Sequence, residues 1–448
     1  MNLKEIHRIY FVGIGGIGMS ALARYFHVMQ KEIAGYDKTP TKITKSLESL
    51  GVAIHYKDSV VEIPAEFKNK SQTLVVYTPA VPESHKELQY FREEGFTILK
   101  RAEVLGLITQ NSFCFAVAGT HGKTTTSSIL GHILQPYNAT SFLGGISENY
   151  HSNLILGGDE ISVVEADEFD RSFLKLSPNI ACITSMDADH LDIYGEHVEL
   201  ENSFKEFSQK VTNHLIIAKG LDIPGVTYAV NEEADYQIQN IRIVKGSYIF
   251  DISTPKEKIV DVEFSIPGKH NLMNALAAFA MASSYGISSE KIKQSLKTFR
   301  GVERRFSYKI KTEDFVLIDD YAHHPTEIHA VHQAIREMYP QEKVLAIFQP
   351  HLFSRTKDFV DQFADELSKF DELLLLDIYP ARELPIEGVN SDWLLHKINN
   401  ANKKLTYREN LVSEIKKSDA KIIVMLGAGD IGVMVEEVKK ELILIANI

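Results

Sequence analysis

The chain has 448 residues, 44% of them hydrophobic and 24% charged, a balance typical of globular domains rather than disordered segments. A net charge of −12 argues against a nucleic-acid-binding surface, so no nucleic-acid partner is expected. The sequence shows neither a signal peptide nor an apolar run of about 20 residues, and we expect a cytoplasmic protein with no membrane insertion. The two cysteines, Cys114 and Cys182, lie in apolar runs and are expected to be reduced core residues.

The first segment, residues 1–110, alternates short β-rich runs with helical ones. Residues 9–12 are predicted to form a strand, and the glycine-rich residues 13–18 a turn that leads into a helix. Further strands are expected just before Asp37 and over residues 74–77. This alternation is typical of a parallel, doubly wound sheet, so a Rossmann-like domain is predicted.

The glycines of this turn have the spacing G-x-G-x-x-G, and Asp37 follows about 20 positions later, as in dinucleotide-binding domains. The same spacing recurs at residues 427–432, after another apolar run, so the pattern alone is weak evidence. Such glycines allow the backbone to approach a diphosphate closely. A nucleotide-sugar diphosphate satisfies this as well as NAD, and nicotinamide chemistry is the second interpretation of this segment.

The middle segment, residues 111–307, contains the most informative motif. An apolar run leads into residues 119–125, GTHGKTT, and a helical run follows. This is the layout of a phosphate-binding loop, in which small residues expose N–H groups, Lys123 neutralises phosphate oxygens and Thr124 offers a hydroxyl to Mg²⁺. Val117 stands where the usual first glycine belongs, so the loop is shortened. We infer an ATP-using enzyme with a P-loop-type central domain.

Acidic residues follow two further strand-like runs of this segment. They are Glu165, Asp167, Glu168 and Asp170 after the first, and Asp187, Asp189 and Asp192, with His190, after the second. Because ligands of open α/β sheets bind beyond the carboxyl ends of strands, both clusters are expected to share one crevice with the phosphate loop. Carboxylates beside a nucleotide are suitable ligands for Mg²⁺. A solvated acidic loop is the alternative interpretation of each cluster.

Residues 225–267 are β-rich, and a hairpin is expected there. His270, Asn271 and Asn274 then stand at the start of an alanine-rich helix. Capping is the ordinary explanation for Asn271. Contact with adenine or ribose is the alternative for the three residues together.

The last segment, residues 308–448, has three strand-like runs that each end in polar residues. These include Asp319, Asp320, His323 and His324 after the first run, and His351 and Arg355 after the second. A third doubly wound, Rossmann-like domain is predicted. Metal binding by the histidines is a competing interpretation, but their spacing is not that of a zinc site and no cysteine joins them.

Six motifs, in this order along the chain, resemble those of the Mur ligases. They are residues 119–125 (GTHGKTT), 165–168 (EADE), 189–192 (DHLD), 270–275 (HNLMNA), 304–306 (RRF) and 319–325 (DDYAHHP). The glycine loop and residues 349–356 add to the match, which covers nearly the whole chain. Mur ligases are ATP-dependent, amide-forming enzymes of peptidoglycan precursor synthesis.

The resemblance implies a three-domain α/β ligase of cell-wall biogenesis. ATP would phosphorylate the carboxylate of UDP-N-acetylmuramate, and L-alanine would displace phosphate from the acyl phosphate. The implied cofactor is Mg²⁺, ATP is a co-substrate, and the expected assembly is a monomer or a weak homodimer. A related ligase that recycles a whole tripeptide onto UDP-muramate is the alternative, since it would share every ATP motif.

The resemblance also implies roles for individual residues. For the UDP-sugar they are Gly13, Gly15, Gly16 and Gly18, with Asp37 near the uridine. For ATP they are Gly119, Thr120, His121, Gly122, Lys123, Thr124, Thr125, His270, Asn271, Asn274, Arg305 and Asp320. For the metal they are Thr124, Glu165 and His190, and for the amino-acid and muramoyl side they are His351 and Arg355.

Lys123, Arg305 and His323 are the expected catalytic residues. The acceptor of the amine proton stays open among His323, His324 and Asp320. Two interpretations come from other classes: an NAD-dependent oxidoreductase with a fused ATP-binding module, and a non-catalytic ATP-binding regulator. The many charged groups at strand ends argue against the regulator.

Overall fold

The computed structural model describes residues 3–186, 197–244, 246–381 and 383–446. It contains three β-sheets, and residue contacts divide the chain into two compact units. The first unit comprises residues 1–241, 249–264 and 272–300, and the second comprises residues 242–248, 265–271 and 301–448. Among the described residues, no helix is long and apolar enough to cross a membrane.

The first sheet has five parallel strands in the order β3-β2-β1-β4-β5. The strands are β1 (Arg8–Val12), β2 (Glu32–Tyr36), β3 (Ala53–His55), β4 (Thr73–Tyr77) and β5 (Thr97–Lys100). The α-helices are α1 (Ile17–Val28), α2 (Lys42–Glu48), α3 (Lys86–Glu93) and α4 (Arg101–Thr109). Short 3-10 turns are η1 (Leu3–Glu5), η2 (Val60–Glu62) and η3 (Ala65–Lys68).

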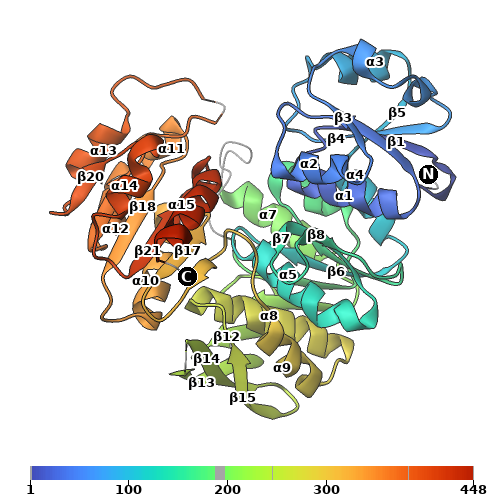
Figure 1. Cartoon of the computed structure of the whole chain (residues 1–448). Coiled ribbons are helices and arrows are strands. Elements are labelled where there is room, and N and C mark those ends of the chain that lie inside the picture. Colours follow the sequence, from blue (N-terminus) through green and yellow to red (C-terminus); the bar gives the residue numbers. More distant parts are fainter. Residues whose placement is uncertain (1–2, 187–196, 245, 382, 447–448) are drawn as a thin grey trace. The chain divides into compact units, whose positions relative to one another are not determined.

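Strand β1 shows why this sheet is covered on both faces. Ile9 and Phe11 are buried in one apolar cluster with side chains of α1, α2 and α4, whereas Tyr10 and Val12 are buried in another with a side chain of α3. Successive side chains of a strand point to opposite faces, so an uninterrupted apolar run needs cover on both. Figure 1 shows these helices on the two sides of the sheet. The predicted doubly wound arrangement is confirmed.

The second sheet has ten strands in the order β15-β14-β13-β12-β11-β10-β6-β9-β7-β8. The strands are β6 (Phe113–Ala118), β7 (Thr140–Ser147), β8 (Ser152–Ile155), β9 (Ile161–Glu165), β10 (Ile180–Ile183), β11 (His214–Ala218), β12 (Val226–Val230), β13 (Tyr236–Val244), β14 (Ser247–Ser253) and β15 (Lys258–Phe264). The helices are α5 (Lys123–Leu134), η4 (Gln135–Tyr137), η5 (Phe169–Lys175), α7 (His197–Ser208), α8 (Lys269–Tyr285) and α9 (Ser289–Thr298).

The three strands that precede the predicted motifs, β6, β9 and β10, are parallel neighbours, with β6 in the middle. Their carboxyl ends therefore lie side by side, as the sequence predicted. The expected hairpin corresponds to β14 and β15, which are neighbours in the sheet. This sheet thus places the phosphate loop and the first acidic cluster at one edge.

The third sheet, in the second unit, has the order β16-β17-β21-β18-β19-β20, and β16 is antiparallel to β17. The strands are β16 (Ser307–Lys311), β17 (Val316–Asp320), β18 (Val344–Phe348), β19 (Glu372–Leu375), β20 (Lys403–Leu405) and β21 (Ile422–Leu426). The helices are α10 (Pro325–Met338), α11 (Phe353–Asp358), α12 (Val360–Leu367), α13 (Ser391–Lys397), η6 (Arg408–Asn410), α14 (Leu411–Ile415) and α15 (Ile431–Ala446).

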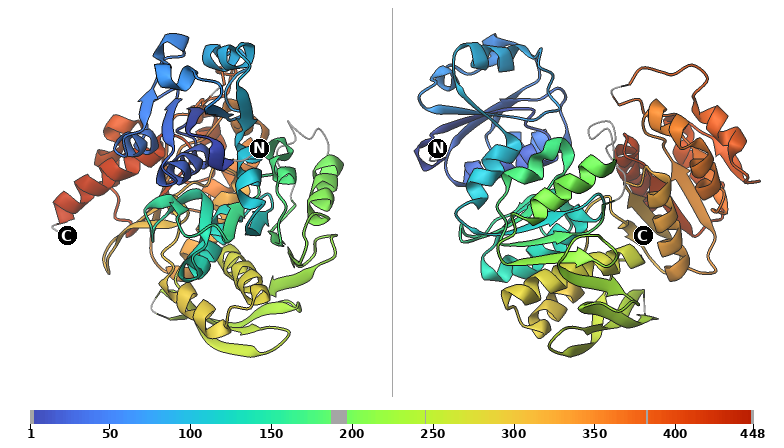
Figure 2. Two further views of the ribbon diagram at one scale, coloured as in Figure 1. Left: turned by 90° about the vertical axis from the view of Figure 1, so that its right-hand side faces the viewer. Right: turned by 180° about the vertical axis from the view of Figure 1, so that it is seen from behind.

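The third sheet is also buried on both faces. Val316 and Ile318 of β17 pack with α10, α12 and α13, whereas Leu317 packs with α14 and α15. The views of Figure 2 show these helices on either side of the strands. The third doubly wound sheet is thereby confirmed.

A small polar cluster is buried beneath α3 in the first unit. Glu87, whose side chain is fully buried, accepts hydrogen bonds from the Tyr10 hydroxyl at 2.7 Å and from the N–H of Ser59 at 3.1 Å. His55 Nε2 lies 2.7 Å from the same hydroxyl. Burial outweighs the two hydrogen bonds and raises the pKa of Glu87 to about 7.

Glu87→Gln is expected to remove a pH dependence from the stability of the first sheet. Because the folded chain raises the pKa of Glu87, its contribution to stability is full at acid pH and is lost as pH rises to about 7. The loss is about 3 kcal/mol, and the Gln variant lacks it. Hydrogen exchange of the β1 amides, converted to opening free energies across this pH range, measures the difference. Equal pH profiles of the two proteins would contradict the raised pKa.

Candidate active site

The predicted phosphate loop lies between β6 and α5. Gly119 and Gly122 have φ angles of +132° and +82°, a region that glycine adopts without strain. A Cβ atom on Gly119 would overlap Thr184, and one on Gly122 would overlap Asn274. The two glycines therefore allow a tight loop that presents the N–H groups at the start of α5, where a helix favours an anion.

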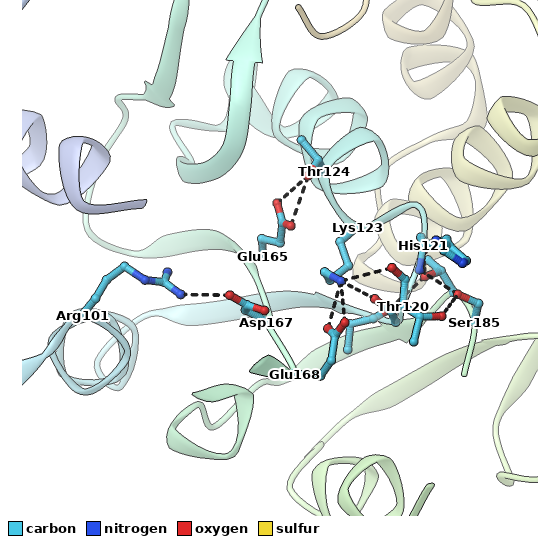
Figure 3. Close-up of polar contacts among 12 residues, drawn as sticks. Arg101, Thr120, His121, Lys123, Thr124, Glu165, Asp167, Glu168 and Ser185 are labelled. Atoms are coloured by element: carbon cyan, nitrogen blue, oxygen red, sulfur yellow. Dashed lines mark hydrogen bonds and ion pairs between the residues drawn. The ribbon is translucent and has the colours of Figure 1, made fainter. Parts of the chain in front are cut away.

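Ser185, just beyond β10, holds this loop in place (Figure 3). Its hydroxyl lies 2.8 Å from Thr120 Oγ1 and accepts a hydrogen bond from the N–H of His121 at 2.9 Å. Its carbonyl oxygen accepts the N–H of Thr120 at 3.2 Å. Thr125 is buried in the first turn of α5. Ser185 was not among the site residues predicted from the sequence, in which its position at a strand end was the only signal.

Lys123 lies beneath the loop as a cation. Its Nζ donates to the carbonyl oxygen of Gly119 at 2.6 Å and to Glu168 at 2.9 Å, and the side chain of Glu168 is fully buried. Burial alone lowers the pKa of Lys123, but Glu168 and Glu165 together raise it above the ordinary value. Lys123 therefore carries its charge at neutral pH, next to the place where the loop receives an anion.

Thr124 and Glu165 place their side-chain oxygen atoms next to one another beside the loop. The Thr124 hydroxyl lies 3.1 and 3.0 Å from the two carboxylate oxygens of Glu165. Glu165 ends β9 and is paired in register with Val117 of β6. A Cβ atom on Gly144 would overlap the Glu165 carboxylate, so Gly144 leaves the space that it fills. A hydroxyl and a carboxylate next to a phosphate loop fit Mg²⁺.

His190, the third predicted metal ligand, lies outside the described residues, as does the acidic cluster around it. Within the described part of the chain, no group of three or more His, Cys, Asp or Glu side chains is arranged to hold a metal ion. Mg²⁺ commonly takes only one or two protein carboxylates and completes its shell with phosphates and water. The Thr124 and Glu165 pair is compatible with that mode of binding.

The polar start of α8 has two separate local roles. In the first unit, Asn274 accepts a hydrogen bond from Thr126 at 3.2 Å and lies beside Gly122 of the phosphate loop. In the second unit, Asn271 Nδ2 donates to the carbonyl oxygen of Pro267 at 2.6 Å, and His270 is exposed. Asn271 is the third residue of α8 and donates through its side chain, so this contact secures the turn before the helix without being the cap expected for it.

Asp320, in the second unit, ends β17 and is buried. Its two oxygens accept hydrogen bonds from the N–H groups of Phe306 at 2.6 Å and Ala322 at 2.7 Å. Burial raises the pKa of Asp320 to about 7, although Arg305 and both hydrogen bonds act in the opposite direction. Arg305 lies over the ring of Tyr321, 5.5 Å from its centre. The arrangement holds the Arg305 segment next to the end of β17.

Three predicted residues of the second unit come together. The rings of His323 and His351 are 6.0 Å apart, and His351 Nδ1 lies 3.4 Å from Arg355 Nη1. His351 also stacks on Tyr379 at 5.7 Å. The neighbouring His324 instead caps α10, with its Nδ1 accepting the N–H of Thr326 at 3.4 Å. The sequence did not show that the two adjacent histidines have different roles, but their contacts do: His324 caps a helix, whereas His323 lies near His351.

The glycine loop of the first sheet turns as predicted between β1 and α1. Gly13 has a φ of +89°, and its N–H donates to the carbonyl oxygen of Tyr36 at 2.8 Å. The N–H of Gly15 donates to Asp37 Oδ2 at 2.7 Å. Gly16 caps α1 and Gly18 lies in its first turn. Asp37 therefore supports the loop itself, which adds a structural role to the one expected for it.

Models of one protein family match three segments of the chain. Residues 8–112 match the "Mur ligase family, catalytic domain", residues 117–282 the "Mur ligase middle domain", and residues 304–432 the "Mur ligase, glutamate ligase domain". Together these segments contain the phosphate loop, the first glycine loop and the described polar strand ends.

Individual proteins of this kind are similar over the whole length. UDP-N-acetylmuramate–L-alanine ligases of Flavobacterium psychrophilum and Flavobacterium johnsoniae are 61% and 59% identical over 446 residues, and each alignment covers 99% of both chains. The crystal structure of UDP-N-acetylmuramate-alanine ligase from Thermotoga maritima superposes with a TM-score of 0.85 at 28% identity, covering 97% of this chain and 99% of that one. A murein peptide ligase from Psychrobacter arcticus shares the fold, with a TM-score of 0.68 at 23% identity over 97% and 98% of the chains.

Proposed function

The chain belongs to the Mur ligase family, and on this premise we propose that it joins L-alanine to the carboxylate of UDP-N-acetylmuramate, with conversion of ATP to ADP and phosphate. Relatives of that name align with it from end to end. The observation that carries the proposal is the loop in which Lys123 and Thr124 contact Glu168 and Glu165. This loop supplies what phosphoryl transfer requires, a fixed cation beside a cradle of N–H groups.

A carboxylate resists attack by an amine because it is anionic and has no leaving group. Transfer of the γ-phosphoryl group of ATP to a carboxylate oxygen gives an acyl phosphate and ADP. The amine nitrogen then attacks the acyl carbon, and phosphate leaves from a tetrahedral intermediate. Both steps gather negative charge on oxygen, so positioned cations are the main source of catalysis.

Lys123 and Arg305 are proposed to supply this positive charge at the phosphates. Thr124 and Glu165, with His190 as a third candidate, would hold Mg²⁺, which neutralises phosphate charge when bound. Around the phosphates we place Gly119, Thr120, His121, Gly122, Thr125 and Asn274. For the adenosine we propose His270, Asn271 and Asp320, the last through the ribose.

His323 is proposed to accept the proton of the amine. Its Nδ1 lies 2.9 Å from the carbonyl oxygen of Tyr321, so Nδ1 carries the hydrogen and Nε2 of the neutral ring has a free lone pair. Burial, together with the charge of Arg355, lowers the pKa of His323, which keeps the ring neutral at physiological pH. His351 and Arg355 beside it are proposed to face the amino-acid and muramoyl groups.

In the first sheet, the glycine loop is proposed to hold the UDP diphosphate. Gly13, Gly15, Gly16 and Gly18 bring the backbone close to it, and Asp37 lies at the uridine end. A cytoplasmic location would suit ATP and a nucleotide sugar as substrates. The domain boundaries at residues 110 and 307 and the monomer or weak homodimer stay predictions.

Phosphate release from ATP tests the proposed function. The full-length protein is incubated with ATP, Mg²⁺ and UDP-N-acetylmuramate, and L-alanine or the tripeptide is added in parallel. We expect the fastest release with L-alanine and a product heavier than the UDP-sugar by one alanine residue. Release with the tripeptide alone would instead assign the recycling reaction. Release with neither amine, or reduction of NAD, would contradict the ligase.

The affinity for ATP is expected to depend on the protonation of Asp320. Each carboxylate oxygen has a second lone-pair site, which a ribose hydroxyl can use when Asp320 is ionised. With a pKa of about 7, Asp320 becomes ionised as pH rises, so the KM for ATP should fall between about pH 6 and 8, by at most about tenfold. In Asp320→Asn this fall should disappear while the KM for L-alanine keeps its profile. A variant with the wild-type ATP profile would contradict the ribose role.

A further inference from the structure

Arg101, the first residue of α4, contacts two loops at once. Its Nη2 lies 3.4 Å from Asp167 Oδ2, in the loop that follows Glu165 (Figure 3). Its other terminal nitrogen, Nη1, lies at the first turn of α1, where a Cβ atom added to Gly18 would be 2.9 Å away. The guanidinium therefore divides its two terminal nitrogens between the glycine loop and the acidic loop.

Gly18 makes room for this arrangement. Its φ lies outside the left-handed region, so its backbone would accept other residues. The third glycine of a G-x-G-x-x-G pattern usually allows a helix to pack closely on a strand. Here the Cβ position would also lie 2.9 Å from Cδ and 3.2 Å from Nε of Arg101. The space left by Gly18 is occupied by the arginine.

The start of α1 is fixed in place and lies beside the guanidinium of Arg101. Asn153 of β8 donates from Nδ2 to the carbonyl oxygen of Ile17 at 2.6 Å and to Ser20 Oγ at 2.8 Å, which ties this turn to the second sheet. The side chain of Arg101 is 22% exposed, so its charge is only partly screened by water. A part-buried guanidinium against a fixed helix start is well suited to bind a diphosphate. The guanidinium can donate either one hydrogen bond or two parallel hydrogen bonds to the phosphate oxygens.

We propose that Arg101 is a further binding and positioning residue, whose Nη1 binds a diphosphate oxygen of the UDP-sugar while Nη2 stays on Asp167. The inference rests on the proposed function, because it takes the UDP-sugar as ligand of the first glycine loop. One side chain then links the UDP-sugar to the loop that carries Glu165 and Glu168. A planar guanidinium can serve both partners at once, whereas an ammonium is a single point charge.

The inhibition constants of UDP and uridine, measured against UDP-N-acetylmuramate with the full-length protein, test this inference. Arg101→Ala should weaken UDP by about 10- to 100-fold, the usual effect of losing a hydrogen bond between charged groups. Uridine carries no phosphate, so its inhibition constant should not change. Arg101→Lys keeps the charge and loses the second nitrogen, so it should fall between wild type and the Ala variant.

Lys175→Ala is the matched control. Lys175 Nζ lies 3.8 Å from Glu103 Oε1 and so links η5 to α4, the helix that Arg101 begins, through a more exposed cation. Its removal should leave the inhibition by UDP unchanged, because exposed pairs contribute little. A loss of UDP affinity in this control would mean that α4 needs the ion pairs only for its position, and would overturn the inference.

Gly18→Ala provides an independent variant. Its Cβ would displace the Arg101 side chain, so UDP should bind more weakly, and the change should add little in the Arg101→Ala background, where the space is open. Equal weakening of UDP and uridine by Arg101→Ala, or unchanged UDP inhibition, would overturn the role of Arg101 alone. A wild-type protein that UDP does not inhibit would overturn this inference together with the proposed UDP-sugar site.

Discussion

Lys123→Ala is expected to lower kcat by about 10²- to 10³-fold, the usual effect of removing one positioned donor from a developing anion. Lys123 is the cation held under the phosphate loop by Gly119 and Glu168. The KM for UDP-N-acetylmuramate should stay near its wild-type value, because the glycine loop of the first sheet does not depend on Lys123. Steady-state phosphate release with each substrate varied in turn measures both quantities.

The same substitution leaves Glu168 buried without its cation, which is expected to destabilise the protein by about 3–5 kcal/mol. The double variant Lys123→Ala/Glu168→Gln separates this effect from catalysis. Removal of the buried charge should restore much of the thermal stability while turnover stays low. Recovery of turnover together with stability would show that Lys123 serves the fold rather than the reaction.

Glu165→Gln is expected to raise the Mg²⁺ concentration for half-maximal activity by about tenfold or more and to lower kcat. The variant keeps the size of the side chain next to Thr124 but removes the negative charge that a divalent ion requires. Binding of Mn²⁺ in the presence of ADP, followed by electron paramagnetic resonance, provides a readout that is independent of turnover. That binding should weaken to a similar extent.

Two further variants test whether the loss of metal binding is specific to the Glu165 carboxylate. Gly144→Ala should act in the same direction, because its Cβ would take the space of the Glu165 carboxylate. Glu160→Gln is the control, since Glu160 is exposed and stands next to the opposite end of β9. Unchanged Mn²⁺ binding in Glu165→Gln, or an equal loss in Glu160→Gln, would contradict the metal role of Glu165.

The conformation of the phosphate loop was predictable because its residues are adjacent in the sequence, and a strand, a glycine turn and a helix in succession determine where its N–H groups point. Its supports were less visible in the sequence. Glu168 follows Lys123 by 45 positions, and the rule that strand ends converge placed it only in the same region. Ser185, which holds Thr120 and His121, is a common residue in an ordinary position. Which residues support the loop in this way depends on which strands are neighbours in the sheet.

The two glycine patterns show a second limit of sequence reasoning. Both lie on a strand-to-helix turn, and in both the space beside a glycine is taken by a side chain: by Arg101 at Gly18, and by side chains from elsewhere in the second unit at residues 427–432. A Cβ atom on Gly429 would overlap Gln349 and Tyr379, and one on Gly432 would overlap Arg304. Glycine spacing indicates that some group approaches the backbone closely, and only the fold shows which group that is.

The polar groups of the third sheet were recognised as a set but not sorted by role. His324 caps a helix and Asp320 accepts two backbone N–H groups, whereas His323 keeps Nε2 available beside His351. These assignments follow from the hydrogen-bond partners, which are Thr326 for His324, Tyr321 for His323, and both Phe306 and Ala322 for Asp320. Of the three candidates for proton transfer, the geometry favours His323.

Isotope transfer from the carboxylate of UDP-N-acetylmuramate tests whether the reaction passes through an acyl phosphate. The carboxylate is labelled with heavy oxygen, and the wild-type protein is supplied with ATP, Mg²⁺ and L-alanine. Formation of an acyl phosphate requires one carboxylate oxygen to leave with phosphate, so the released phosphate should carry one labelled oxygen and the alanine product should keep the other. Unlabelled phosphate, or release of AMP and diphosphate, would contradict the proposed reaction.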